Sequence, residues 1–141
     1  MPFARLTLLV PQPDVQVAAL SQSIAGLVAG LLHKRFELTS VLVETPNGNA
    51  WTIGGRPQKV AAHLDVTVTA GTNSPQEKAD FIQRAMVLLR KALPDLHVAT
   101  YVVVTETPAH NWGYDGQTQA QRALAQSNAS AHREAASAAS A

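Results

Sequence analysis

Residues 44–58 read ETPNGNAWTIGGRPQ and residues 106–119 read ETPAHNWGYDGQTQ, so one phrase occurs twice, with an extra residue before the first Trp. Each copy begins where a Val-rich run typical of a β-strand ends. Turn-forming residues then follow in both copies. The recurrence indicates that a single supersecondary unit is present twice in the chain.

The residues before the first copy predict a strand, a helix and a second strand. Residues 3–10 are a β-type run, which Pro11 and Pro13 end. Apolar residues then recur at helical spacing, so they share one face of a helix that ends near His33. These residues are Leu20, Ile24, Leu27 and Leu31. Residues 38–44 form the next β-type run and complete the unit.

The same order of elements is repeated after Pro57. Residues 64–70 alternate apolar and polar side chains, which is the period of a half-buried strand. Ser74, Pro75 and Glu77 fit the cap, the first turn and the capping box of a helix. The expected buried stripe of that helix is Ile82, Met86, Leu89 and Leu93, and residues 98–105 form the fourth strand.

Two βαβ units in one chain predict an α+β fold. Each unit joins two parallel strands through a crossover helix, so the pair makes a four-stranded mixed sheet with two helices on one face. The other face stays partly apolar, and we expect the sheets of several subunits to pack through it. The expected domain spans residues 2–120, with repeats at 2–58 and 62–119. The Ala- and Ser-rich residues 127–141 are expected to be a disordered tail.

Composition excludes several classes of function. The chain of 141 residues has no cysteine, which rules out disulfides and thiolate chemistry and suits the cytoplasm. A net charge of +1 gives no basic surface for nucleic acid. The apolar residues 24–32 are too few to span a membrane, and no basic segment typical of a signal peptide precedes them. The five histidines lack metal-ligand spacing and no nucleotide-binding glycine loop is present, so neither metal nor cofactor is expected.

The opening MPFARLTL, together with LTSVLVETPNGNAWTIGG and YVVVTETPAHNWGYDG, resembles the tautomerase superfamily in its fused form of two βαβ units. The resemblance covers about residues 2–119. It implies the fold shared by 4-oxalocrotonate tautomerase and macrophage migration inhibitory factor (MIF), and a homotrimer. It also implies that Pro2 becomes a general base once Met1 is removed. A free α-amino group titrates at about 7.7–8.0, and desolvation or a nearby cation lowers that pKa toward neutrality.

The arginines that hold both substrate carboxylates in the 4-oxalocrotonate tautomerase pattern are absent. The matching positions carry Gln12, Thr72, Leu42 and Tyr101. A diacid substrate therefore lacks its bidentate clamp. In the MIF branch, the lysine near the proline corresponds to Lys34 and the pocket tyrosine to Tyr101, but the pocket asparagine corresponds to Val103.

These matches imply a substrate-binding set of Lys34, Tyr101, Arg56 and Trp51. Lys34 would bind a carboxylate or polarise a carbonyl, and Tyr101 would donate to an enolate oxygen. Trp51 corresponds to the aromatic wall beside the proline, and Arg56 is a candidate for a carboxylate contact. A structural alternative exists for each: a helix C-terminal cation for Lys34, a β-former for Tyr101, a solvated loop residue for Arg56. Trp51 could equally pin its hairpin, the role preferred for Trp112.

The resemblance implies a cofactor-independent tautomerase or isomerase of a 2-oxo or 2-hydroxy-enoate acid, with a monocarboxylate of the phenylpyruvate kind fitting best. A hydratase or dehalogenase of a short unsaturated acid is the enzymatic alternative, for which Glu106 and Asp115 are available acids. The third reading is a non-catalytic trimeric binder of small ligands. The second repeat has Ala62 or His63 where the first has Pro2, so a base is expected only at the start of the chain.

Overall fold

The computed structural model describes residues 1–47 and 50–140, and it divides into two compact bodies. The N-terminal body comprises Met1–Glu106 and the C-terminal body begins at Thr107. The first contains β1 (Phe3–Leu8), α1 (Asp14–Leu32), a 3-10 turn η1 (Phe36–Leu38), β2 (Ser40–Glu44), β3 (Thr52–Ile53), β4 (Arg56–Pro57), β5 (Ala62–Thr69), α2 (Pro75–Ala92) and nearly all of β6 (Val102–Thr107).

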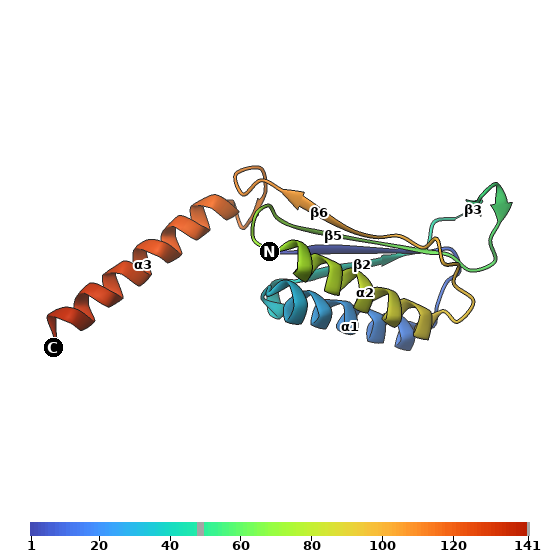
Figure 1. Ribbon diagram of the computed structural model, residues 1–141, viewed down its shortest axis with the longest axis horizontal. Helices are drawn as coiled ribbons and strands as arrows, with labels where there is room; N and C mark the ends of the chain where they lie inside the picture. Colours follow the sequence, from blue (N-terminus) through green and yellow to red (C-terminus); the bar gives the residue numbers. More distant parts are fainter. Residues whose placement is uncertain (48–49, 141) are drawn as a thin grey trace. The chain divides into compact units, whose positions relative to one another are not determined.

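The predicted mixed sheet with two helices is confirmed. Its strand order is β2-β1-β5-β6, and both α1 and α2 lie on the same face of it (Figure 1). β1 runs parallel to β2, with Phe3 opposite Ser40, and antiparallel to β5, with Phe3 opposite Thr67. Both βαβ repeats therefore contribute to one sheet, with β1 and β5 at its centre.

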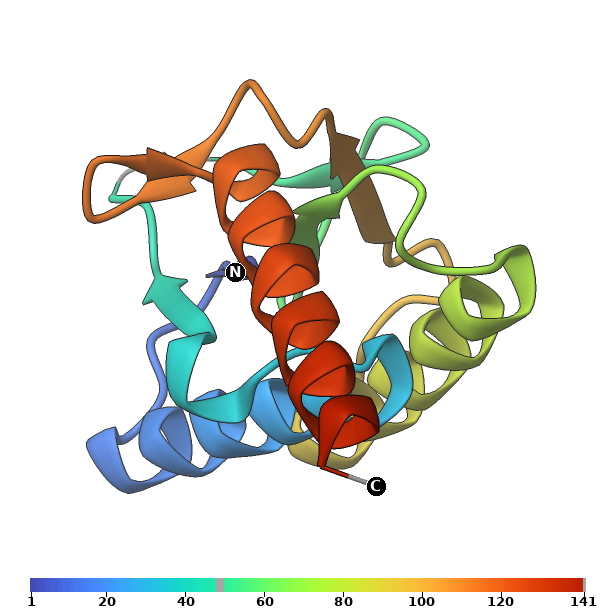
Figure 2. The ribbon, with the colours of Figure 1, turned by 90° about the vertical axis from the view of Figure 1, so that its left-hand side faces the viewer.

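The core lies between the sheet and the helices. Alternate residues of β1 and β5 are buried, as the strand period predicts. The two helices lie side by side and cover these residues (Figure 2). The buried set from the sheet is Ala4, Leu6, Leu8, Ala62, Leu64, Val66 and Val68, and from the helices Leu20, Ile24, Val28, Leu32, Phe81, Ala85 and Leu89.

The buried stripe of α2 differs from the predicted one. Phe81 and Ala85 are fully buried, whereas Ile82 is 40% exposed and Met86 only partly buried. Four-residue steps from Phe81 lead to Ala85 and Leu89, so the stripe begins one residue earlier than expected. The large ring at Phe81 contributes more apolar area to the core than Ile82 would.

Helix α1 is longer than the apolar stretch 24–32 noted in the sequence. An 18-residue window within its 19 residues has a mean hydropathy of 1.7, so by length and composition it could cross a membrane. The core helix of a soluble protein passes the same test. In this fold one side of α1 packs on the sheet, with Leu20, Ile24 and Val28 buried.

The C-terminal body consists of a hairpin and a helix. The hairpin pairs β7 (Gly113–Tyr114) with β8 (Gln117–Thr118), and α3 (Gln119–Ala139) follows. The segment expected to be disordered from residue 127 is thus helical as far as Ala139. Alanine is the strongest helix former, and a Thr118–Gln121 capping box starts the helix. The last residue of that expected tail, 141, lies outside the described residues.

The first repeated phrase also forms a hairpin, in which Thr52 of β3 lies opposite Pro57 of β4. Residues 48 and 49 of that phrase lie outside the described part of the chain. Both copies therefore fold as a short two-stranded element that follows a strand of the main sheet. The other sequence signature, the capping box of α2, is present, because Ser74 and Glu77 exchange side-chain and backbone hydrogen bonds of 3.1 and 2.9 Å.

Replacing Phe81 by alanine tests the register of α2 against the sheet. We expect Phe81→Ala to lower the free energy of unfolding by about 3–5 kcal/mol, because it removes a fully buried ring. Val87, on the same helix and 59% exposed, is the control, and Val87→Ala should cost less than about 1 kcal/mol. Urea denaturation followed by circular dichroism measures both. Similar costs for the two variants would contradict the observed packing.

Candidate active site

Pro2 lies at one end of the sheet, directly before β1. Its side chain is fully buried. Its carbonyl oxygen accepts a hydrogen bond from the Ser40 amide at 3.2 Å, which ties it to the start of the parallel strand β2. A group on the nitrogen of Pro2 would therefore act in a desolvated, fixed environment.

Lys34 belongs to the same end of the sheet. The preceding residue, His33, caps α1 in the left-handed conformation with φ 54°, which turns the chain out of the helix. The Lys34 Nζ atom donates to Thr72 Oγ1 at 2.7 Å. Thr72 follows the end of β5, and β5 pairs Thr67 with Phe3, next to Pro2. Burial lowers the pKa of Lys34, while the carboxylates of Glu77 and Glu106 oppose that shift.

Two carboxylates occupy this end and hold the loop between β5 and α2. Glu106 accepts from Lys78 Nζ at 3.1 Å and from the Gly71 amide at 3.4 Å, and these bonds lower the pKa of Glu106. Glu77 accepts from Asn73 Nδ2 at 3.0 Å and from the Ser74 amide at 2.9 Å, which lowers the pKa of Glu77. These are charge-assisted hydrogen bonds, the stronger kind.

The other predicted site residues, Trp51, Tyr101 and Arg56, lie at the end of the sheet opposite to Pro2. Trp51, Tyr101 and His63 line a cavity of about 290 Å³ next to the hairpin β3–β4. The Tyr101 carbonyl accepts from the Leu64 amide at 3.2 Å, near the start of β5. Because β5 runs antiparallel to β1, that start lies beside Leu8, the last residue of β1.

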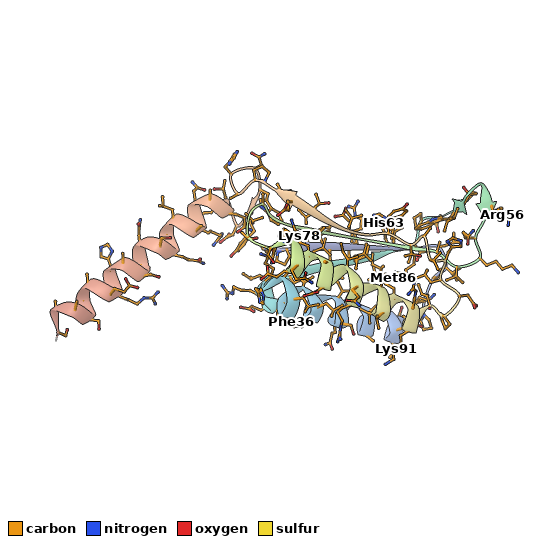
Figure 3. The ribbon with its side chains drawn as sticks, in the orientation of Figure 1. Phe36, Arg56, His63, Lys78, Met86 and Lys91 are labelled. Atoms are coloured by element: carbon orange, nitrogen blue, oxygen red, sulfur yellow. The ribbon has the colours of Figure 1, made fainter. Side chains whose placement is uncertain are left out.

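Arg56 does not line that cavity. It is exposed on β4, opposite Ile53. Figure 3 places Arg56 at the hairpin end of the N-terminal body and Lys78 at the other end. Pro2 and Lys34 thus lie at one end of the sheet, whereas Trp51 and Tyr101 line one cavity at the other end. Arg56 belongs to neither pair.

Of the two candidates for the counterpart of Pro2 in the second repeat, Ala62 matches its burial and His63 does not. Pro2 and Ala62 are fully or almost fully buried, whereas His63 is only half-buried and lines a hollow on the open face of the sheet. The alternation of buried and half-buried residues along β5 therefore favours Ala62 over His63 as the counterpart. An alanine inside the chain carries no free amine, so this position offers no base.

Sequence reasoning missed three hydrogen-bond donors at the Pro2 end: the Gly71 amide, the Lys78 ammonium and the Asn73 side-chain amide. Thr72 was noted only as the position of an absent arginine. A signal was present, because GTNSPQEK follows a predicted strand and starts a helix in the second repeat, at the end where Lys34 leaves α1. Among the described residues, no group of three His, Asp or Glu is arranged to hold a metal ion.

The lowered pKa of Glu77 predicts a pH-dependent contribution to stability. A carboxylate with a folded-state pKa below its unfolded value stabilises the fold above the unfolded pKa, about 4.3, and loses that contribution as pH falls through the folded pKa. Glu77→Gln should therefore be less stable than wild type at pH 7, with a difference that shrinks below about pH 4. Asp95→Asn, at an exposed position, is the control. Denaturation midpoints measured from pH 7 to pH 3 test this, and a pH-independent difference for Glu77→Gln would refute it.

No protein-family model matches the chain, and no curated protein does. Solved structures are similar to it. A macrophage migration inhibitory factor-like protein from Entamoeba histolytica is 20% identical, with a TM-score of 0.70 over 83% of this chain and 97% of that one. Native fused 4-OT is 21% identical, with a TM-score of 0.75 over 87% and 98% of the two chains. Pt0534 inactivated by 2-oxo-3-pentynoate is 12% identical, with a TM-score of 0.76 over 85% and 97%. The fold of this chain is accordingly that of the tautomerase superfamily, the fold that the repeated phrase led us to expect.

Proposed function

We propose that this chain is a cofactor-independent tautomerase of a 2-oxo or 2-hydroxy-enoate acid, with Pro2 as the general base. The observation that carries the proposal is the position of Pro2: a fully buried ring at the end of the sheet where the Lys34 ammonium is held by Thr72. A base and a cation for the substrate carboxylate would then lie at the same end of one sheet.

Removal of Met1 would convert the Pro2 nitrogen from an amide into a secondary amine. Burial disfavours the protonated form of such an amine, so a useful fraction would be neutral near pH 7. The neutral nitrogen takes the proton of the enol hydroxyl as the carbonyl forms. The ammonium then returns a proton to a carbon of the same substrate, which completes the shift without net change in the enzyme. Lys34 would hold the carboxylate during both transfers.

The rest of the pocket would come from a neighbouring copy in a homotrimer. Trp51 and Tyr101 lie at the far end of the sheet from Pro2, so they cannot enclose a substrate bound to Pro2 of their own chain. On the sheet, Phe3 and Leu42 are more than a third exposed, which leaves apolar area for a second copy. Similar solved structures include a fused 4-OT asymmetric trimer, 18% identical with a TM-score of 0.75. Arg56, exposed on its hairpin, remains a candidate for a carboxylate only across such an interface.

The substrate proposed is a small 2-oxo acid or its enol. One similar protein was inactivated by 2-oxo-3-pentynoate, a compound of this class. A monocarboxylate with an apolar body suits a pocket with one lysine and the aromatic residues Trp51 and Tyr101. We place the reaction in the cytoplasm, in keeping with a chain that has no cysteine.

A specific observation favours the hydratase or dehalogenase as second candidate. Glu106 is a carboxylate at the Pro2 end, where an acid that activates water would be needed. A structure from the cis-3-chloroacrylic acid dehalogenase family is 18% identical, with a TM-score of 0.69. Glu106 is engaged by Lys78 and Gly71, which makes it a poorer base, so we rank this candidate second. A non-catalytic binder would use the same pocket without turnover.

Replacing Pro2 tests the proposed base. Intact mass first establishes that Met1 is absent, since a retained Met1 leaves Pro2 as an amide. Pro2→Ala should then lower kcat/KM for phenylpyruvate enol-to-keto conversion by about 10²-fold or more. Pro94→Ala, which changes an exposed proline after α2, should leave the rate unchanged. Equal ultraviolet assay rates for Pro2→Ala and wild type would rule out the proposed base.

Mixing two inactive variants tests whether neighbouring copies share the site. Pro2→Ala and Tyr101→Phe chains, unfolded together and refolded, would place an intact Pro2 beside an intact Tyr101 in about a quarter of the sites of a trimer. We therefore expect about a quarter of the wild-type rate from the mixture. Each variant refolded alone is the control. A mixture no more active than the separate variants would contradict a shared site.

A further inference from the structure

The carboxylate of Glu106 lies in a small set of donors at the Pro2 end. One oxygen accepts from Lys78 Nζ at 3.1 Å, and the other accepts from the Gly71 amide at 3.4 Å. Lys34 attracts the same carboxylate electrostatically. About a third of the Glu106 side chain and a quarter of the Lys78 side chain are exposed, so this contact is partly shielded from water. The chain thus has a carboxylate-binding site, filled by its own side chain.

The donors are held independently of Glu106. Gly71 has φ 76°, a conformation that suits glycine and presents its amide at the turn after β5. Thr72 donates to the Thr69 carbonyl at 2.7 Å and accepts from Lys34, so Lys34 stays at the same turn. Lys78 lies in the first turns of α2, whose start is fixed by the capping box. Removal of the Glu106 carboxylate would therefore leave a preformed set of donors rather than a collapsed loop.

The balance of charge decides what this site accepts. Lys34 and Lys78 supply two positive charges, and the Glu106 carboxylate is paired with Lys78. The Glu77 carboxylate also attracts Lys34. Asn73 and the Ser74 amide already donate to Glu77, however, so it stays bound to its own helix start. A substrate with one carboxylate needs only Lys34. The second carboxylate of a diacid would meet the Glu106 carboxylate, and like charges at short range disfavour such binding.

We propose that Glu106 is a specificity-determining residue that occupies, with its own carboxylate, the place of a second substrate carboxylate, so that the site takes monocarboxylates and rejects dicarboxylates. This inference rests on the proposed function only for the statement that substrates bind at the Pro2 end. It gives a physical cause for the expected preference for a substrate with one carboxylate. That cause is the presence of the Glu106 carboxylate, rather than the absence of the two substrate-binding arginines. The alternative is that Glu106 has only a structural role, in which its hydrogen bonds connect the end of β6 to the turn after β5.

Crotonate and fumarate are matched probes, because they share a four-carbon unsaturated skeleton and differ in the second carboxylate. Their binding is followed by NMR of the side-chain signals of Lys34 and Lys78, without turnover. In Glu106→Gln, fumarate should bind about tenfold more tightly than in wild type, while crotonate changes less than about twofold. Asp95→Asn removes one negative charge at an exposed position after the C-terminal end of α2, in the same body, and should change neither affinity.

Two further variants distinguish the effect of the Glu106 charge from an effect on the structure of the turn. Glu106→Asp keeps the negative charge and should keep fumarate weak, even if the shorter side chain loosens the turn. Adding Lys78→Met to Glu106→Gln should abolish the increase in fumarate affinity, because the Lys78 ammonium that would bind the second carboxylate is then absent. An unchanged fumarate affinity in Glu106→Gln, or an equal gain in Asp95→Asn or Glu106→Asp, overturns the proposal. Because binding is read without catalysis, an inactive Pro2 would leave this result intact and the two proposals can fail separately.

Discussion

The antiparallel pairing of β1 with β5 is the constraint on which the rest of the structure depends. It joins the two βαβ repeats into one sheet, with Phe3 opposite Thr67 and Leu8 opposite Ala62. Alternate side chains of both strands are buried under α1 and α2, which fixes their register, since a slip of one residue would expose the whole buried set. The same pairing sends the starts of the two repeats to opposite ends of the sheet.

This geometry divides the candidate site residues into two groups. Pro2 and Lys34 lie at the end of the sheet where the first repeat starts, and Trp51 and Tyr101 line one cavity at the end where the second starts. A complete pocket of the proposed kind then requires more than one copy of the chain, so assembly and chemistry depend on the same sheet. Within one copy, charge-assisted hydrogen bonds around Glu106 hold the turn to which Lys34 is bonded. In the proposed mechanism, local structure at that turn would set which acids can approach Pro2.

Elements with a short-range signal were predictable from the sequence. The strand period, the capping box of α2 and the repeated phrase each depend on residues close together in the chain, and each has its structural counterpart. The helix in the Ala-rich tail was not predicted, because the low hydrophobicity of this segment favours disorder. The high helix propensity of alanine favours the helix that the structure has. The one-residue shift of the α2 stripe toward Phe81 depends on packing against the sheet, which periodicity alone does not resolve.

The candidate site was less predictable, because its contacts join distant residues. Pro2 and Lys34 followed from the resemblance, but the separation of Tyr101 and Trp51 from Pro2 follows only from the strand directions. The pair of Lys78 with Glu106 spans 28 positions of sequence, and Lys34 with Thr72 spans 38. No spacing rule links such residues before the sheet is known.

The central claim is that a buried Pro2 amine is neutral enough to act as a base near pH 7. A 15N NMR titration of the Pro2 nitrogen, in protein shown by mass to lack Met1, measures its pKa directly. The account predicts a pKa below the ordinary α-amino range of about 7.7–8.0, because the ring is fully buried and Lys34 lies at the same end of the sheet. A pKa above that range would contradict it.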